Sequence, residues 1–293
     1  MPQSASTTTP TTSPARLMDG TALARRIVET TAERAAAFTA RTGTSPCLAT
    51  VLVGEDPASV TYVRMKQNRC RKAGIVSRHV ALPAETTTAE LVHTLTALST
   101  DPAVHGILLQ HPMGEHIDER AAFEAIAPEK DVDGVTLSSY AAMSFGLPGF
   151  QSCTPGGIMR LLDAYDVDPA GSRAVVVGRS AILGKPVGML LLARDATVTY
   201  CHSRTKDLGA VVREADIVVA AVGRPELIRG EDIKPGAVVI DAGYNPGNVG
   251  DVHFASAVER AGLITPVPGG VGPMTIATLM EQTVTGAERQ LGL

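Results

Sequence analysis

The chain has 293 residues, of which 44% are hydrophobic, 19% charged and 3% aromatic, a composition that excludes a mainly disordered protein. At roughly 100 to 200 residues per domain, this length predicts two domains. Lys and Arg total 26 against 30 for Asp and Glu, a formal net charge of −4, so the sequence predicts no basic surface and no nucleic-acid partner.

The cysteines and the apolar segments indicate in which cellular compartment the protein is located. The four cysteines, at 47, 70, 153 and 201, are scattered and show no C-x-x-C spacing, which predicts reduced thiols rather than a zinc site or a disulfide framework. No window approaches the roughly 18 to 20 apolar residues of a membrane span, and the N-terminus lacks the pattern of a signal peptide. We therefore expect a cytoplasmic protein with no membrane partner.

The first half of the chain alternates helices and strands. Residues 1–16 are mostly Ser, Thr and Pro and are predicted to form a disordered tail. From Asp19 to Gly43 a capping residue, helix formers and a terminal glycine predict a helix. Helices are also predicted over 58–72 and 88–98. Three short apolar runs are predicted to form buried parallel strands: 47–54, 77–82 and 106–110.

The second half repeats this alternation. Four apolar runs predict a second parallel sheet: 174–180, 196–203, 216–223 and 237–243. Segment 144–157 is rich in turn residues and is the predicted linker. The fold class is therefore α/β with two domains, over 17–149 and 150–274. The family resemblance given below implies that the first is catalytic, that the second is of Rossmann type, and that a cleft lies between them. The last helix, 275–293, is expected to pack back on the first domain.

A glycine-bearing turn joins the first strand of the second sheet to its helix. Gly178 and Gly184 bracket this turn, which would let a phosphate approach the backbone and the helix N-terminus. A plain turn without a ligand is the alternative, because the spacing departs from G-x-G-x-x-G. Ser203 and Arg204 end the next strand, where NAD-specific domains carry an acidic residue. With Arg179 they would suit a 2′-phosphate, which favours NADP over NAD.

Polar residues of the first domain are predicted to converge on Lys66. Tyr62 and Lys66 share one face of a predicted helix. Gln110 ends a buried strand at the carboxyl edge of its sheet, and Asp131 and Asp133 lie in a short polar segment. A partly desolvated Lys66 could carry protons near neutral pH. An ordinary exposed lysine is the alternative.

A loop before the last helix and the histidines complete the candidate features. Residues 264–275 hold three prolines and three glycines, which is typical of a loop that contacts a ligand or of a rigid turn between domains. His111, His202 and His253 stand apart without metal-ligand spacing, so no metal is expected.

Six segments resemble one family, in the same order along the chain: VGEDPASVTYVRMK, GILLQHP, KDVDG, CTPGGIMRLL, VVVGRSAILGKPVGMLL and TPVPGGVGPMTIATLM. The family is that of the bifunctional methylenetetrahydrofolate dehydrogenase/methenyltetrahydrofolate cyclohydrolases. The resemblance covers nearly everything after the tail. It implies a homodimer that oxidises 5,10-methylenetetrahydrofolate with NADP and hydrolyses the 5,10-methenyl product to 10-formyltetrahydrofolate, in the one-carbon metabolism that serves purine biosynthesis.

The resemblance also implies a role for each matching residue. Lys66 would be the acid/base of hydrolysis and Gln110 would hold it, while Tyr62 would pack on the aminobenzoyl ring and Asp133 would bind the pterin. The loop residues that would close over the folate are Pro268, Gly269 and Gly270. The residues that would bind NADP are Gly178, Arg179, Ser180, Gly184, Ser203, Arg204, Gly223 and Thr275. Hydride transfer would need orientation rather than a metal or a base.

Three segments depart from the family's usual text and are expected to line the folate cleft: 135–146, 110–114 and 152–155. Because Tyr62, Lys66, Gln110 and Asp133 are all present, we expect an active variant. Three alternatives stay open at this point. They are a dehydrogenase with impaired cyclohydrolase activity, a shikimate-type or amino-acid dehydrogenase, and a non-catalytic homologue that binds folate or a nucleotide.

Overall fold

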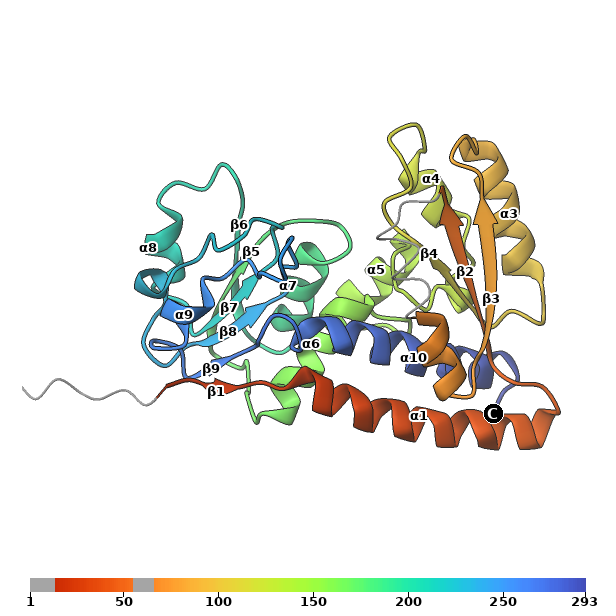
Figure 1. Ribbon diagram of the computed structural model, residues 1–293, viewed down its shortest axis with the longest axis horizontal. Helices are drawn as coiled ribbons and strands as arrows, with labels where there is room; N and C mark the ends of the chain where they lie inside the picture. The colour runs from red at the N-terminus through yellow and green to blue at the C-terminus, as the bar shows by residue number, and fades with distance from the viewer. Residues whose placement is uncertain (1–13, 55–65) are drawn as a thin grey trace, which may run out of the picture.

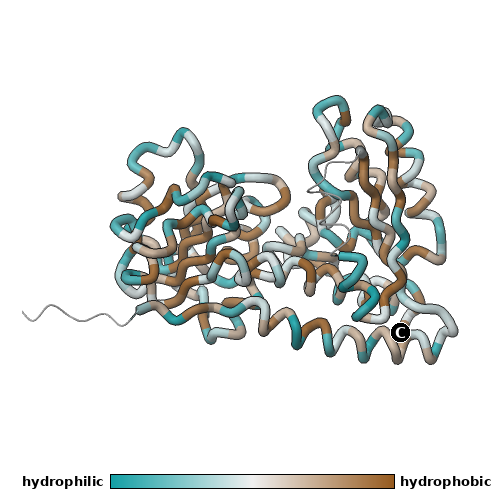
Figure 2. The backbone as a smooth tube through the Cα atoms, in the orientation of Figure 1, coloured by the Kyte–Doolittle hydropathy of each residue, from teal (hydrophilic) through white to brown (hydrophobic). Residues whose placement is uncertain are grey.

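The computed structural model describes residues 14–54 and 66–293 of the chain. Two parallel sheets stand at opposite ends of the molecule, and two long helices run from its middle beneath the three-stranded sheet (Figure 1). The hydrophobic segments concentrate on the strands of both sheets (Figure 2). Each sheet therefore forms the centre of its own core, as expected for strands covered on both faces.

The smaller sheet has the order β3-β2-β4, with β2 (Cys47–Val53), β3 (Val76–Leu82) and β4 (Gly106–Leu109). Every residue of β2 and β4 is buried, which explains their apolar sequences. The expectation that 77–82 is a buried strand is wrong, because β3 lies at the sheet edge and exposes part of its side chains. Helices α3 (Thr88–Thr100) and α4 (Glu119–Glu124) contribute to the apolar core on this sheet.

The larger sheet has six parallel strands in the order β1-β9-β8-β7-β5-β6. Their bounds are β1 (Arg16–Leu17), β5 (Arg173–Val177), β6 (Thr197–Cys201), β7 (Ile217–Ala220), β8 (Val238–Asp241) and β9 (Leu263–Ile264). The four expected strands are β5 to β8, and the two short strands β1 and β9 were not expected. The predicted disorder of 1–16 is wrong for Ala15 and Arg16, since Ala15 N donates to Val258 O at 2.8 Å and Arg16 pairs with Leu263.

Helices α1 (Gly20–Thr42) and α10 (Val271–Gln290) lie side by side (Figure 1). Asp19 caps α1 by accepting from Ala22 N at 3.0 Å, and Gly43 ends it with a φ of 76°, so this helix is confirmed. Helix α10 contacts α6 (Cys153–Ala164) as well as β2 and β4. The last helix of the chain therefore forms part of the core beneath the first sheet.

Shorter helices complete the chain: α5 (Leu137–Ser144), η1 (Pro128–Lys130), α7 (Gly184–Leu192), α8 (Leu208–Val212), η2 (Gly230–Asp232) and α9 (Phe254–Ala257). Helix α5 contacts α7, so it lies between the two sheets. Among the described residues, no helix combines the length and the apolar character that a membrane span requires.

Candidate functional site

Lys66 and Gln110 contact each other directly. Residues 66–72 are helical, and Lys66 Nζ donates to Gln110 Oε1 at 3.0 Å. Gln110 follows β4, and its backbone N donates to Val51 O at 2.8 Å. Its Nε2 donates to His111 O at 2.8 Å. Because both ends of the amide are bonded, its oxygen is held toward the lysine.

Burial weakens the preference of Lys66 for its charged form. The residue is only 7% exposed, and burial lowers its pKa below the usual range for lysine, while the nearby Asp133 carboxylate opposes this shift. Burial raises the pKa of Asp133, and the charge of Lys66 opposes that shift in turn. The two groups therefore interact electrostatically, and the charge of each opposes the effect of burial on the pKa of the other.

The two aspartates of the polar segment differ in role. Asp131 is fully buried, and its carboxylate accepts from Val135 N at 3.1 Å and Thr136 N at 2.9 Å. It therefore orders the backbone that leads into α5, and the expectation that it converges with Lys66 is wrong. Asp133 is half-buried and its carbonyl accepts from Cys153 N at 3.2 Å. Tyr62, the remaining predicted residue, lies outside the described residues.

A cavity of about 940 Å³ is lined by residues of both halves of the chain. Its lining includes the whole loop 266–273, and therefore the predicted Pro268, Gly269 and Gly270, as well as Thr275. Thr275 Oγ1 lies 3.0 Å from Thr154 Oγ1, which is also in the lining. Lys66, Gln110 and Asp133 are not in the lining, but Arg69, about one turn along from Lys66, is.

Several cavity residues were missed by the sequence analysis. They are Thr21, Arg69, Thr154, Ile182, Leu183, Ile276 and residues 241–244. The position of Asp241 could have been found, because it ends β8 at the carboxyl edge, where open α/β sheets bind ligands. The others come from helix ends and turns, whose proximity to the cavity depends on the packing of α1 and α10.

The predicted nucleotide turn connects β5 to α7. A Cβ at Gly178 would lie 2.2 Å from Ala221 O, so the close approach of β5 and the end of β7 requires glycine there. Ser180 Oγ accepts from Leu183 N and Gly184 N, both at 3.2 Å. These two N–H groups at the start of α7 are therefore already bonded, so the expected approach of a phosphate to the helix N-terminus is wrong for them.

The basic residues of this region lie at the ends of neighbouring strands. Arg179 follows β5, while Ser203 and Arg204 follow β6, and all three are exposed. Strands β5 and β6 pair in parallel, so their carboxyl ends lie side by side. Arg204 N donates to His202 Nδ1 at 3.2 Å, which fixes the backbone of the second turn. These cations are thus presented at one edge of the larger sheet.

Gly223 lies in a turn after β7 that is organised by a buried carboxylate. Asp251 is fully buried and accepts from Val222 N at 2.6 Å and from Gly223 N and Arg224 N, both at 2.9 Å. Asn245 Nδ2 also donates to it, at 3.0 Å. The sequence analysis missed Asp251, which carries no motif and acts across 28 residues of chain.

A second buried carboxylate lies beside the first. Asp241 accepts from Gly243 N at 2.9 Å, Asp251 N at 3.0 Å and Val252 N at 2.9 Å, and it lines the cavity. Burial raises the pKa of Asp241 to about 6, despite these hydrogen bonds. The two carboxylates together fix the turn after β7 and the loop after β8.

The departures from the family text do not all reach the cavity. None of residues 135–146 is in its lining, and most of them form α5, so the expected place of this segment along the folate cleft stays a prediction. Ser152 Oγ donates to Gly134 O at 2.7 Å and is buried. His111 Nδ1 lies 2.8 Å from Glu119 Oε2, and the backbone carbonyl of His111 accepts the hydrogen bond from Gln110 Nε2.

Within 14–54 and 66–293, no group of three His, Cys, Asp or Glu residues is placed to hold a metal ion.

Comparison with known proteins adds independent information. The tetrahydrofolate dehydrogenase/cyclohydrolase catalytic domain matches residues 18–133, and the NAD(P)-binding domain of the same name matches 152–291. A curated protein of Streptomyces avermitilis named bifunctional protein FolD 1 is 79% identical over 282 residues, which are 96% of this chain and 98% of that protein.

Solved structures agree with these matches. The bifunctional FolD of Campylobacter jejuni is 42% identical with a TM-score of 0.92, covering 94% of this chain and 99% of that one. The Trypanosoma brucei FolD, described as complexed with NADP cofactor and inhibitor, is 39% identical with a TM-score of 0.92. The match covers 96% of this chain and 100% of that one. The expected fold class and family are confirmed, and the shikimate-type alternative is wrong. This chain belongs to the tetrahydrofolate dehydrogenase/cyclohydrolase family.

Proposed function

We propose that this protein catalyses both reactions of its family, the NADP-dependent oxidation of 5,10-methylenetetrahydrofolate and the hydrolysis of the 5,10-methenyl product to 10-formyltetrahydrofolate. The observation that carries this proposal is the buried Lys66, whose Nζ donates to Gln110 Oε1 at 3.0 Å, about one turn from a cavity-lining residue. A lysine held in this way suits proton transfer better than a structural role.

In the hydrolytic step Lys66 acts as the proton carrier. The neutral amine accepts a proton from water as the water oxygen attacks the methenyl carbon. The protonated lysine then donates to N5 as the bond between N5 and that carbon breaks, and the hydroxyl group on the carbon loses its proton to solvent as the carbonyl forms, which leaves the formyl group on N10. Gln110 keeps Nζ in place, Asp133 binds the pterin, and Tyr62 packs on the aminobenzoyl ring. The cavity loop 266–273 closes over the folate.

In the oxidative step the protein orients the reactants. NADP supplies the hydride acceptor when it is bound, and the nitrogen lone pairs of the folate stabilise the resulting iminium, so no protein base is required. The residues present fit the cofactor. The backbone at Gly178 leaves no space for a Cβ, and exposed cations follow β5 and β6. The proposed NADP residues are Gly178, Arg179, Ser180, Gly184, Ser203, Arg204, Gly223 and Thr275.

Cofactor preference provides a test of the basic residues. Arg179→Ala is expected to weaken NADP binding by about tenfold while leaving NAD binding little changed, because only NADP carries the 2′-phosphate. Titration of the purified protein with each oxidised cofactor measures both constants. Arg194→Ala removes a partly exposed arginine of the same domain that pairs with Asp163, and serves as the control. An unchanged ratio of the two constants would remove Arg179 from the 2′-phosphate site.

We also propose the division of the chain and its assembly. Folate binds to the domain of residues 17–149, to which 275–293 return, and NADP binds to 150–274. Two copies associate through the nucleotide domains. Strand β6 is an edge of the larger sheet and its Tyr200 is 37% exposed, while Leu192, at the end of the contacting helix α7, is 53% exposed. An unpaired strand edge flanked by apolar side chains suits a second copy of the same surface.

Sedimentation tests this assembly. The wild-type protein is expected to sediment as a dimer, and Leu192→Glu is expected to shift it to monomer at the same concentration, because a charge cannot be buried unpaired in the interface. Leu147→Glu, at another exposed leucine, is the control. If the wild-type protein is monomeric, or if both variants remain dimeric, this interface is wrong.

We also propose that the protein is cytoplasmic. Its four buried free thiols support this location, because reduced cysteines are typical of cytosolic proteins.

The function itself is tested by a paired absorbance assay. Purified protein receives methylenetetrahydrofolate with NADP or with NAD, and reduced cofactor and methenyltetrahydrofolate are followed separately. Reduced cofactor without accumulating methenyltetrahydrofolate is the expected result. Accumulation of the methenyl compound would indicate a dehydrogenase with impaired hydrolysis, and no signal with either cofactor would favour a non-catalytic binding protein.

A further inference from the structure

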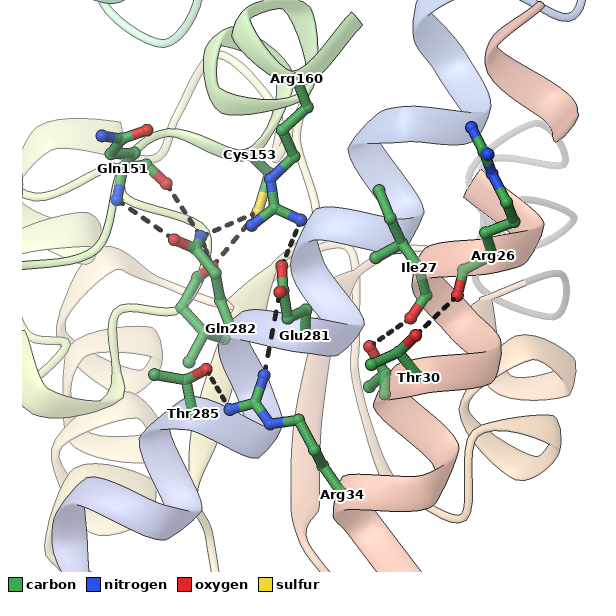
Figure 3. Close-up of polar contacts among 12 residues, drawn as sticks. Arg26, Ile27, Thr30, Arg34, Gln151, Cys153, Arg160, Glu281, Gln282 and Thr285 are labelled. Atoms are coloured by element: carbon green, nitrogen blue, oxygen red, sulfur yellow. Dashed lines mark hydrogen bonds and ion pairs between the residues drawn. The ribbon is translucent and has the colours of Figure 1, made fainter. Parts of the chain in front are cut away.

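The side chain of Gln282 links the last helix to the folate half of the chain. Gln282 lies on α10, about two turns after the cavity-lining Thr275. Figure 3 shows its amide pointing away from α10 toward Gln151 and Cys153, at the start of α6. Next to it on the helix, Glu281 pairs with Arg34 and Arg160.

The amide of Gln282 is bonded at both ends. Its Nε2 donates to Val132 O at 2.8 Å and to Gln151 O at 2.9 Å, and it lies 3.4 Å from Cys153 Sγ. Its Oε1 accepts from Gln151 N at 3.2 Å. Both donor positions and the acceptor are therefore used, so the amide can take only one orientation without losing hydrogen bonds.

These bonds end on the backbone beside Asp133. Val132 precedes it directly, and the Asp133 carbonyl accepts from Cys153 N. A Cβ at Gly134 would lie 2.5 Å from the carbonyl carbon of Gln151, so the two segments are in close backbone contact. The Gln282 side chain bonds to both segments at once.

We propose that Gln282 is a positioning residue of the folate site, which holds the backbone of 132–134 so that the Asp133 carboxylate lies correctly against the pterin and Lys66. This inference rests on the proposed role of Asp133. The same helix begins at the loop 266–273 and carries Thr275. It therefore supports two sides of the substrate site, one through its N-terminus and one through this amide.

The test uses two glutamines of the same helix. Gln290 Nε2 also donates to two backbone carbonyls, His105 O at 2.9 Å and Glu129 O at 3.2 Å, but neither lies beside Asp133. Gln282→Leu is expected to raise the KM for methylenetetrahydrofolate about tenfold, corresponding to the loss of one or two hydrogen bonds. The KM for NADP should stay unchanged. Gln290→Leu is expected to leave both constants unchanged.

Two further measurements separate positioning from stability. Gln282→Glu keeps the size and the acceptor but loses both donations, and it is expected to raise the same KM without a matching fall in kcat. Calorimetric titration with tetrahydrofolate, which needs no turnover, should show the same loss of affinity in both Gln282 variants. If either variant that folds binds tetrahydrofolate like the wild type, or if Gln290→Leu weakens binding equally, the inference is wrong. Failure of the wild-type protein to bind tetrahydrofolate would instead overturn the proposed function.

Discussion

Lys66→Met is expected to lower the rate of methenyltetrahydrofolate hydrolysis by about 10²–10⁴-fold, because a positioned proton carrier contributes that much and methionine carries no proton. Oxidation of methylenetetrahydrofolate should retain a substantial fraction of its rate, since hydride transfer requires orientation but no proton carrier. Following reduced cofactor and methenyltetrahydrofolate in one reaction measures both steps. The variant should accumulate the methenyl compound.

The matched control is Lys72→Met, which removes an exposed lysine from the same helical segment. It is expected to leave both rates unchanged. The pH dependence gives a second check. Burial lowers the pKa of Lys66, so the neutral amine forms at lower pH than in an exposed lysine, and wild-type hydrolysis should rise as pH increases through that pKa. An equal loss of both activities in Lys66→Met would contradict this division of labour.

Asp251→Asn is expected to lower the free energy of unfolding by about 2–4 kcal/mol and to weaken NADP binding. Asp251 accepts four hydrogen bonds, three from the turn 222–224 and one from Asn245. Each of its two carboxylate oxygens accepts two of them. An asparagine must turn its NH2 group toward two of these donors, which leaves buried N–H groups unpaired. Because Gly223 belongs to that turn, the proposed cofactor site is disturbed directly.

Denaturant unfolding and NADP titration measure the two effects. Glu231→Gln removes one negative charge from an exposed site of the same domain and should change neither quantity. Saturating NADP should restore part of the lost stability, since a ligand that binds only the folded state stabilises it. An unchanged unfolding midpoint in Asp251→Asn would show that these hydrogen bonds are not needed to hold the turn.

Local signals in the sequence predicted the elements that depend on local contacts. Helix α1 begins at the Asp19 cap and ends at Gly43, and both residues act on their own neighbours in the chain. The contact of Lys66 with Gln110 was also predicted, because Gln110 ends a buried strand at the carboxyl edge of its sheet and the resemblance named both residues.

Features that depend on distant partners were missed or misjudged. Strand β1 is two residues long and exists because β9, almost 250 residues later, offers an edge. Asp131 and Asp133 look equivalent in the sequence. They differ because the chain turns back before α5, which brings the N–H groups of 135 and 136 to the carboxylate of Asp131. Asp251 was missed for the same reason, since the turn that it holds is built from another part of the chain.

The position of α10 has a consequence for biosynthesis. Its residues Ile276, Leu279 and Met280 share one apolar cluster with Leu48 and Leu108 of the smaller sheet. During translation these strands leave the ribosome long before the last twenty or so residues do, since domains emerge N-terminal first. The folate domain is therefore made early but completed last, and a chain that stops near residue 270 would leave this apolar surface open to chaperones and proteases.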